Sequence, residues 1–422
     1  MTRQRVAMIG PVPLHWGRGG KWWGGGVSTH VAGIVPALEA CGVSVDLLAE
    51  NATTLSEAPR SRTAKVVPVT HSWPRLVARG GRALPRMASR LLANPKWGQR
   101  IPAGQALRYL GLAANYRAFL GTVQSPLLHV HNARHAQFLC QEVVSTDLPT
   151  VVTVHGVKTL LMPSPRWLRS MVLENYGRAD RLIAVSSFVR ERLVQFGAPA
   201  ERITVIPNAV DSERFCPSDT EDARGRLGLP TLGFVVLFTG NLVPLKGVDQ
   251  LVTAFARSAA RKHGTLVIVG DGPEKEPLQR LVGELGIADE TLFVGARPLP
   301  EMPLWYQACD VFATPSAAEG VSISVLEAMS SARPVVTTLP EVGEHDVVTD
   351  GSTGFLVAFG DVEGLGAALD RLLRNPVHAR VMGDHAREVV VGRCTWPEVA
   401  RRTAEIYRET LLESRARRTD SN

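Results

Sequence analysis

Three side chains in the C-terminal half of the chain combine the charges needed to hold a phosphorylated sugar. Lys246 lies in a Gly- and Pro-rich turn after an apolar run, Glu319 lies ahead of a later helical stretch, and Glu327 lies about two turns into it. A lysine there meets a diphosphate as a compact charge, and carboxylates accept hydrogen bonds from sugar hydroxyls. For the two acids, an ordinary helix-start residue and a solvated glutamate remain open alternatives.

A run of glycines near the N-terminus offers a second candidate phosphate contact. Gly24, Gly25 and Gly26 follow the first predicted strand and a long loop, and they open a helical stretch. Glycines let a phosphate approach backbone amides, although glycine runs are also ordinary in loops. A Gly-x-Gly-x-x-Gly fingerprint is absent, which counts against a nicotinamide-dependent oxidoreductase. No Asp-x-Asp sequence occurs, so we expect no metal on the diphosphate and no cofactor.

These residues need a scaffold that brings the ends of several strands together. Short apolar runs rich in β-branched residues recur, each followed by a stretch with helical spacing, which predicts parallel β-α-β units. In the first half the predicted strands cover residues 6–9, 43–49, 65–69, 127–131, 150–155, 181–185 and 203–206. In the second half they cover residues 234–240, 265–269, 291–294, 311–314 and 334–337. The predicted fold class is α/β with two parallel sheets, and ligands are expected beyond the carboxyl ends of the strands.

The two series of strands imply two domains and a C-terminal tail. A polar passage with Pro and Gly at residues 215–225 separates them, so we expect an N-terminal domain at residues 1–213 and a C-terminal domain at residues 214–396. Residues 397–422 have a helix-forming composition, and we expect this helix to pack back on the first domain. The first domain carries an insertion at about residues 58–120 that is dense in Pro, Gly and Arg.

The composition of the 422 residues, 45% hydrophobic and 21% charged, is typical of a globular protein. The apolar run at the N-terminus is too short for a signal peptide, and no apolar stretch approaches the roughly 18 residues that span a bilayer. Five scattered cysteines form no Cys-x-x-Cys pair. Their spacing predicts reduced thiols in a cytoplasmic protein and no zinc site.

The net charge of +7 comes from one part of the chain. Residues 58–141 contain thirteen Lys and Arg residues and no Asp or Glu. Such a segment suits an anionic partner such as a phosphate-bearing substrate or a membrane surface. Within it, four arginines recur at helical spacing opposite an apolar side: Arg79, Arg82, Arg86 and Arg90. They form a candidate acceptor or membrane face, although a solvated helical face fits the same pattern.

Motifs in a fixed order carry a family resemblance. From about residue 20 to residue 360 the chain resembles retaining glycosyltransferases of family 4, also called glycosyl transferases group 1. The matching motifs are Gly25-Gly26-Val27-Ser28, Val154-His155-Gly156, Val185-Ser186, Ile206-Pro207-Asn208-Ala209-Val210-Asp211, Lys246-Gly247, Gly270-Asp271-Gly272-Pro273, and Glu319 with Glu327. The resemblance implies a GT-B fold, in which two Rossmann-like domains face each other across a cleft. It also implies that the first domain binds the acceptor and the second binds the nucleotide sugar.

Roles follow from the resemblance for individual residues. Gly25 and Gly26 would lie under the diphosphate or the acceptor, and Lys246 would neutralise the diphosphate. Glu327 would hold the ribose hydroxyls, and Glu319 would contact the donor sugar.

Two further positions complete the implied donor site. His155 would border the donor sugar from the first domain, and with Lys246 and Glu319 it makes up the predicted catalytic set. A satisfied histidine at a strand end is the alternative for His155. Gly270 would lie in the donor-binding loop after its strand.

One departure from the family pattern affects the diphosphate. The family usually has an arginine where this chain has Asn241, so a second cation must come from elsewhere. Arg297, which follows a later strand, is a candidate replacement, as is an arginine of the basic insertion.

The resemblance implies metal-independent transfer of a hexose, with retention, from a UDP- or GDP-sugar. Tryptophans and cations at residues 15–23, together with the basic segment, favour a lipid-linked or cell-surface glycan acceptor in polysaccharide assembly. We expect a cytoplasmic protein, with peripheral contact at the inner face of the cell membrane as an added expectation. A soluble natural-product or metabolite acceptor is the alternative, followed by a sugar-nucleotide epimerase and a non-catalytic membrane-binding protein. No nucleic-acid partner is expected, since no recognised nucleic-acid module accompanies the basic patch.

Overall fold

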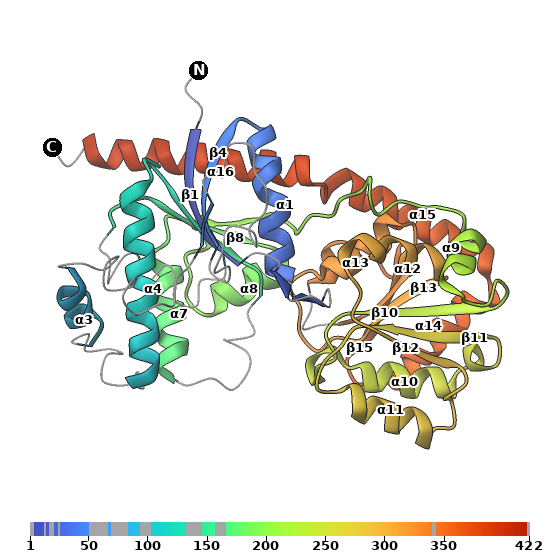
Figure 1. Ribbon diagram of the computed structural model, residues 1–422. Helices are drawn as coiled ribbons and strands as arrows, with labels where there is room; N and C mark the ends of the chain where they lie inside the picture. Colours follow the sequence, from blue (N-terminus) through green and yellow to red (C-terminus); the bar gives the residue numbers. More distant parts are fainter. Residues whose placement is uncertain are drawn as a thin grey trace. The chain divides into compact units, whose positions relative to one another are not determined.

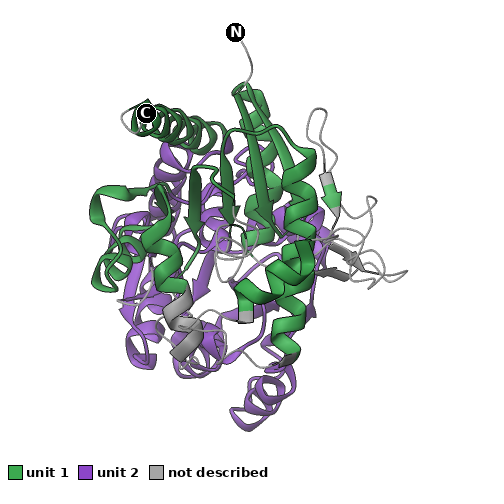
Figure 2. Ribbon diagram, turned by 90° about the vertical axis from the view of Figure 1, so that its left-hand side faces the viewer, with its two compact units in different colours: residues 1–15, 23–206, 397–422 green, residues 16–22, 207–396 purple. Residues whose placement is uncertain are grey.

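Two compact units divide the chain. The computed structural model describes residues 4–11, 14–16, 21–23, 26–49, 66–68, 83–92, 103–131, 140, 146–156, 166–339 and 343–419. The first unit comprises residues 1–15, 23–206 and 397–422, and the second comprises residues 16–22 and 207–396 (Figure 2). Each unit contains a parallel sheet with helices, which confirms the predicted α/β class.

The first unit is built on seven parallel strands in the order β5-β4-β1-β6-β7-β8-β9. These strands are β1 (Gln4–Gly10), β4 (Val43–Ala49), β5 (Val66–Pro68), β6 (Leu128–His131), β7 (Thr150–Val154), β8 (Arg181–Ala184) and β9 (Ile203–Val205). Its described helices before the tail are α1 (Gly26–Ala40), α3 (Leu84–Leu92), α4 (Ala103–Thr122), α7 (Arg166–Arg178), α8 (Ser187–Gln195) and the short η5 (Ala200–Arg202). All five residues of β7 are buried, as expected for a central strand covered on both faces.

The two faces of this sheet are covered by different helices. Ala7 and Ile9 of β1 share a hydrophobic cluster with Ala113 and Tyr116 of α4. Side chains alternate along a strand, so the other buried residues of β1 point to the opposite face. There α1 covers the sheet (Figure 1). This layering leaves the carboxyl ends of the strands as the place where polar side chains gather.

The second unit is built on six parallel strands in the order β12-β11-β10-β13-β14-β15. These strands are β10 (Phe234–Thr239), β11 (Gly264–Val269), β12 (Thr291–Gly295), β13 (Val311–Thr314), β14 (Val335–Leu339) and β15 (Gly354–Ala358). The α-helices are α9 (Thr220–Leu227), α10 (Val248–Arg257), α11 (Lys275–Glu284), α12 (Met302–Ala308), α13 (Ile323–Ser330), α14 (Val362–Arg374) and α15 (Pro376–Arg393). Short 3-10 turns are η6 (Pro244–Lys246), η7 (Ala259–Lys262), η8 (Leu299–Glu301) and η9 (Glu344–Asp346). Alternate residues of β10 and β11 enter two hydrophobic clusters, one on each face of the sheet.

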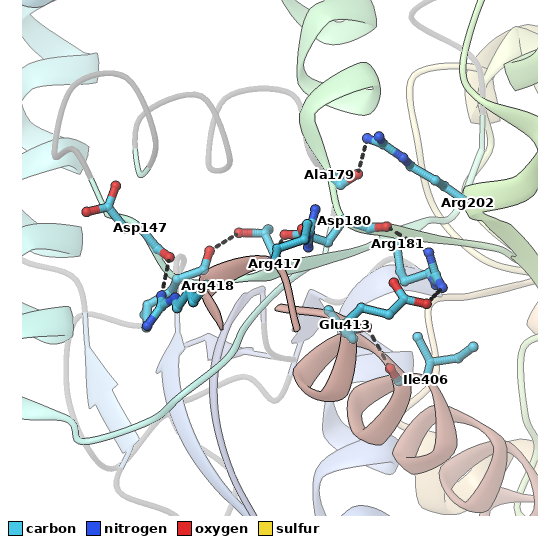
Figure 3. Close-up of polar contacts among 12 residues, drawn as sticks. Asp147, Ala179, Asp180, Arg181, Arg202, Ile406, Glu413, Arg417 and Arg418 are labelled. Carbon is cyan, nitrogen blue, oxygen red and sulfur yellow. Dashed lines mark hydrogen bonds and ion pairs between the residues drawn. The ribbon is translucent and has the colours of Figure 1, made fainter. Parts of the chain in front are cut away.

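The last helix, α16 (Trp396–Thr419), returns to the first unit, which confirms the predicted packing of the C-terminal helix. The hydroxyl of Tyr407 lies 2.5 Å from His129 Nδ1, and both side chains are buried. Near the end of the helix, Arg417 pairs with Asp180 at 2.5 Å, and Glu413 pairs with Arg181 (Figure 3). The buried contact anchors the middle of α16, and the ion pairs hold its exposed end.

Two segments differ in detail from what the sequence indicates. Residues 215–225, predicted as a polar passage between domains, belong to the second unit, whose longer segment begins at Pro207. Phe215 is buried against the ring of Tyr306, and α9 starts at Thr220 with Asp219 as its cap. The long loop expected between the first predicted strand and Gly24 contains a two-stranded sheet, formed by β2 (Leu14–Trp16) and β3 (Lys21–Trp23).

Candidate active site

The strand order of the second sheet reverses next to β10. From β10 the chain runs outward through β11 and β12, and then returns to the other side of β10 with β13. In parallel sheets ligands bind at this switch point, because the two neighbouring loops leave the sheet in opposite directions. The loop after β10 carries Lys246, and the loop after β13 carries Glu319. The fold therefore brings two sequence-predicted site residues to the same edge of the sheet.

A glycine makes the close approach of these two loops possible. Gly247 has a φ of +61°, and a Cβ on it would lie 2.3 Å from the carbonyl oxygen of Pro315. No other residue fits there without moving backbone. Beside it, the backbone amide of Ala317 donates to the carbonyl oxygen of Leu245 at 2.8 Å. The turn that carries Lys246 is thus fixed against the segment that leads to Glu319.

Lys246 and Glu319 form an ion pair at the end of these loops. The Lys246 Nζ lies 2.5 Å from Glu319 Oε1, and the side chains are 17% and 23% exposed. The pair is open enough to be reached and shielded enough for its charges to interact strongly. The glutamate holds the ammonium in place, and the other N–H groups of the lysine can still donate to an anion.

Glu327 lies within α13 and is buried, so the alternative of a solvated glutamate is wrong. Its Oε2 accepts a hydrogen bond from the Tyr306 hydroxyl at 2.7 Å. A tyrosine hydroxyl has one hydrogen, so the Thr239 hydroxyl, 2.7 Å away, donates to it in turn. Burial raises the pKa of Glu327 to about 7. The chain of hydroxyls occupies one carboxyl oxygen and orients the other.

Gly270 directly follows β11 and lies beside the turn that begins at Gly240. Its φ is +154°, and a Cβ on it would lie 1.9 Å from the Gly240 carbonyl oxygen. Asn241 is exposed, and Arg297 is exposed with its guanidinium 3.9 Å from Glu301. The arginine proposed to replace the family's usual cation therefore has a carboxylate neighbour of its own. Its action on a diphosphate stays a prediction.

In the first unit, His155 follows β7 and its Nε2 lies 3.1 Å from Nδ1 of His131, the last residue of β6. Gly26 is exposed and is the first residue of α1, whereas Gly25 lies outside the described residues. His129, also on β6, contacts Thr153 Oγ1 at 2.8 Å, and burial lowers its pKa to about 3. Desolvation and the neighbouring histidines also lower the pKa of His131 well below its usual value.

Two family models cover most of the chain. The model for Glycosyltransferase Family 4 matches residues 24–214, and the model for Glycosyl transferases group 1 matches residues 219–389. A GDP-mannose-dependent alpha-(1-6)-phosphatidylinositol monomannoside mannosyltransferase of Mycobacterium tuberculosis is 33% identical over 268 residues, 60% of this chain and 67% of that relative. The chain belongs to glycosyltransferase family 4.

Other relatives match part of the sequence or the fold, and the chain spans a little over half the length of several curated relatives that it matches. D-inositol 3-phosphate glycosyltransferase 2 of Catenulispora acidiphila is 35% identical over 251 residues, which are 57% of this chain and 58% of that relative's length. Sucrose-phosphate synthase from Thermosynechococcus elongatus superposes with a TM-score of 0.79 at 21% identity, covering 97% of this chain and 100% of that one. The last comparison shows the fold.

The buried carboxyl of Glu327 makes the stability of the protein depend on pH. Between its ordinary pKa of 4.5 and the folded value of about 7, the folded protein keeps a proton that the unfolded chain has released. The free energy of unfolding is therefore expected to fall as pH rises through this window, by on the order of 3 kcal/mol from this group. Glu327→Gln, which does not titrate, is expected to flatten that slope in urea unfolding between pH 4.5 and 8. Equal slopes of the free energy of unfolding against pH in the wild type and Glu327→Gln would contradict the raised pKa of Glu327.

The basic face predicted around residues 79–90 is only partly described. Arg86 and Arg90 lie on α3 and are exposed, whereas Arg79 and Arg82 lie outside the described residues. On the other side of α3, Met87 and Leu91 are buried in the core of the first unit. The apolar side of this helix is therefore used for packing. None of the described helices has the length and hydropathy needed to cross a bilayer.

Sequence reasoning missed three buried side chains that surround the predicted residues. Tyr306 donates a hydrogen bond to Glu327. His131 lies within hydrogen-bond distance of His155, and the ring of His30 packs against that of His155. The only available signal was position: His131 and His155 both stand at the ends of predicted strands that lie next to each other. Tyr306 lies on a helix and gave no such signal.

Proposed function

We propose that this glycosyltransferase moves a hexose from a UDP- or GDP-sugar to an acceptor with retention of anomeric configuration. The observation that carries the proposal is the ion pair of Lys246 and Glu319 at the switch point of the second sheet. It places a cation where a diphosphate can bind and a carboxylate where sugar hydroxyls can donate. The same residues were predicted from sequence as donor contacts.

In the proposed reaction an acceptor hydroxyl attacks the anomeric carbon from the face that the diphosphate leaves. The bond between the anomeric carbon and the phosphate oxygen breaks, and its electron pair stays on the diphosphate. A donor phosphate oxygen accepts the proton of the attacking hydroxyl. Lys246 stabilises the charge that develops on the leaving group, as a preorganised cation does in other transfer reactions. Glu327 accepts hydrogen bonds from the ribose through the oxygen that Tyr306 leaves available.

An anionic acceptor fits the charge of the first unit. Residues 58–141 hold thirteen Lys and Arg and no acidic residue, and Arg86 and Arg90 are exposed. Two relatives are named for inositol-containing acceptors that carry phosphate, one of them a lipid and the other a soluble compound. We favour a lipid-linked glycan, with peripheral contact at the inner face of the membrane and a role in cell-envelope polysaccharide assembly. A soluble metabolite is the second choice.

A panel of UDP-, GDP- and ADP-sugars tests the donor. One of them is expected to raise the thermal unfolding midpoint of the wild type, and Lys246→Ala and Glu319→Ala are expected to reduce that shift. Lys262→Ala, at an exposed lysine of η7, serves as the matched control and should keep the full shift. The stabilisation is expected to persist in a chelator.

Product analysis separates the alternatives. With phosphatidylinositol mannoside and D-inositol 3-phosphate offered in parallel, nucleotide release should require one of them, and NMR of the product should show the anomeric configuration of the donor. An inverted product would refute retention. Conversion of the donor sugar to an epimer without an acceptor would replace the transferase by an epimerase, and no binding of any nucleotide sugar would overturn the proposal.

A further inference from the structure

Three histidines from separate segments of the first unit meet at the carboxyl end of its sheet. His131 ends β6, His155 follows the neighbouring strand β7, and His30 lies in the second turn of α1. One ring nitrogen from each lies within 4.8 Å of those of the other two. We name this group the histidine cluster.

The backbone around the histidine cluster is shaped for close approach. At the end of β1, a Cβ on Gly10 would lie 2.9 Å from the side chain of Val31 and 3.2 Å from that of His131. The glycine thus lets α1 pack near the ends of the strands, next to the helical residue His30. His30 and His131 are buried, whereas His155 is half-buried and gives the cluster a path to solvent.

Hydrogen bonding leaves part of the cluster unsatisfied. His131 Nε2 is buried and has no hydrogen-bond partner among the described residues. Its other nitrogen, Nδ1, faces His155 Nε2 at 3.1 Å. One imidazole offers one nitrogen to an ion, so His131 would bind the metal through Nδ1, the nitrogen that faces His155; imidazole binds metal in its neutral form.

We propose that His30, His131 and His155 bind one divalent transition metal of the zinc class, and that the bound ion takes His155 away from the donor sugar. The second half rests on the proposed function together with the expectation, from the family resemblance, that His155 borders that sugar. The metal would therefore inhibit transfer rather than support it.

The three imidazole ligands determine which kind of metal ion can bind. Imidazole nitrogens suit Zn²⁺, Cu²⁺, Ni²⁺ and Co²⁺, whereas Mg²⁺ and Ca²⁺ require oxygen ligands. In a tetrahedral zinc site with bonds of about 2.0–2.1 Å, the ligand nitrogens are about 3.3 Å apart. His131 Nδ1 and His155 Nε2 already lie near that spacing. Three histidines leave a fourth position open to water. The prediction of no zinc site rested on cysteine spacing, which does not report on histidines brought together by the fold.

Cobalt binding tests the site without reference to activity. The untagged full chain, freed of metal by a chelator and titrated with Co²⁺, is expected to develop visible absorption that saturates at one ion per chain. Zn²⁺ should then abolish that absorption by displacement. His155→Gln, at the half-buried position, and His30→Gln are each expected to weaken Co²⁺ binding by at least about 100-fold, since each removes one of three ligands. His263→Gln, at an exposed histidine of the second unit, should bind as the wild type does.

Glycosyl transfer activity is measured on the same samples. One equivalent of Zn²⁺ is expected to lower acceptor-dependent nucleotide release at least tenfold, and a chelator should restore it. Unchanged Co²⁺ affinity in folded His155→Gln and His30→Gln, or no saturable absorption in the wild type, would overturn the site. Saturable Co²⁺ binding together with full transfer activity in the presence of Zn²⁺ would overturn the proposed inhibition. Failure of all nucleotide sugars to bind, with cobalt binding intact, would count against the proposed function alone.

Discussion

Replacement of Lys246 by alanine is expected to lower kcat/KM for glycosyl transfer by about 100- to 1,000-fold, as loss of a preorganised group that stabilises developing charge does elsewhere. The structure adds a second cost. Lys246 Nζ lies 2.5 Å from Glu319 Oε1, so the variant leaves a partly shielded carboxylate near the bound diphosphate without its counter-charge. Steady-state nucleotide release over a range of donor concentrations measures the effect.

A double-mutant cycle separates the two roles of Glu319. If Glu319 only positions the lysine, Glu319→Ala should cost little once Lys246 is already alanine. If Glu319 also holds the sugar, the double variant should be less active than Lys246→Ala alone. Lys262→Ala controls for the loss of a positive charge in the same unit. A loss below tenfold in Lys246→Ala would rule out a central role for this lysine in stabilising the leaving group.

Gly270→Ala is expected to have the largest effect on stability. Gly270 adopts a φ of +154°, which L-residues rarely occupy, and the new Cβ would lie 1.9 Å from the carbonyl oxygen of Gly240. The obstacle is backbone, so either β11 or the turn that leads to Lys246 must move. The expected loss in the free energy of unfolding is at least about 4 kcal/mol, the range of the most disruptive single substitutions. Urea unfolding followed by circular dichroism measures the loss, and donor binding should weaken with it.

The same substitution at Gly283 is the matched control. Gly283 lies in α11 of the same unit, and a Cβ there meets nothing within 4 Å. Alanine in a helix interior is favoured over glycine, so Gly283→Ala is expected to be neutral or to stabilise by about 0.5–1 kcal/mol. Equal unfolding midpoints for the two variants would show that the close approach at Gly270 relaxes without cost.

Much of the fold could be predicted because buried parallel strands leave a simple sequence signal. The strands at residues 43–49 and 311–314 were predicted with their observed bounds, and the other predicted strands within one or two residues at each end, since each is a short apolar run. β15 (Gly354–Ala358) was missed although it is also an apolar run. Phe215 was assigned to a polar passage because its neighbours are polar, and only its packing on Tyr306 reveals its place in the core.

The candidate site could be predicted only at positions where a sequence motif indicates the local backbone conformation. Lys246 and Gly270 stand in glycine-rich turns after strands, and the structure places these turns at the switch point. The burial of Glu327 and its bond to Tyr306 depend on contacts between residues 21 positions apart on different helices, which no local pattern encodes. The histidine cluster is a stronger case, because its members come from three separate segments.

The return of α16 to the first unit has a consequence for the order in which the protein is made. Residues 207–396 contain all six strands of the second sheet, so that unit can acquire its core while the ribosome is still adding the end of the chain. The first unit starts earlier but finishes later, because His129 must wait for Tyr407, 278 residues further on. Closing so long a loop is slow. The nascent N-terminal half is therefore expected to need protection by chaperones until α16 has been made.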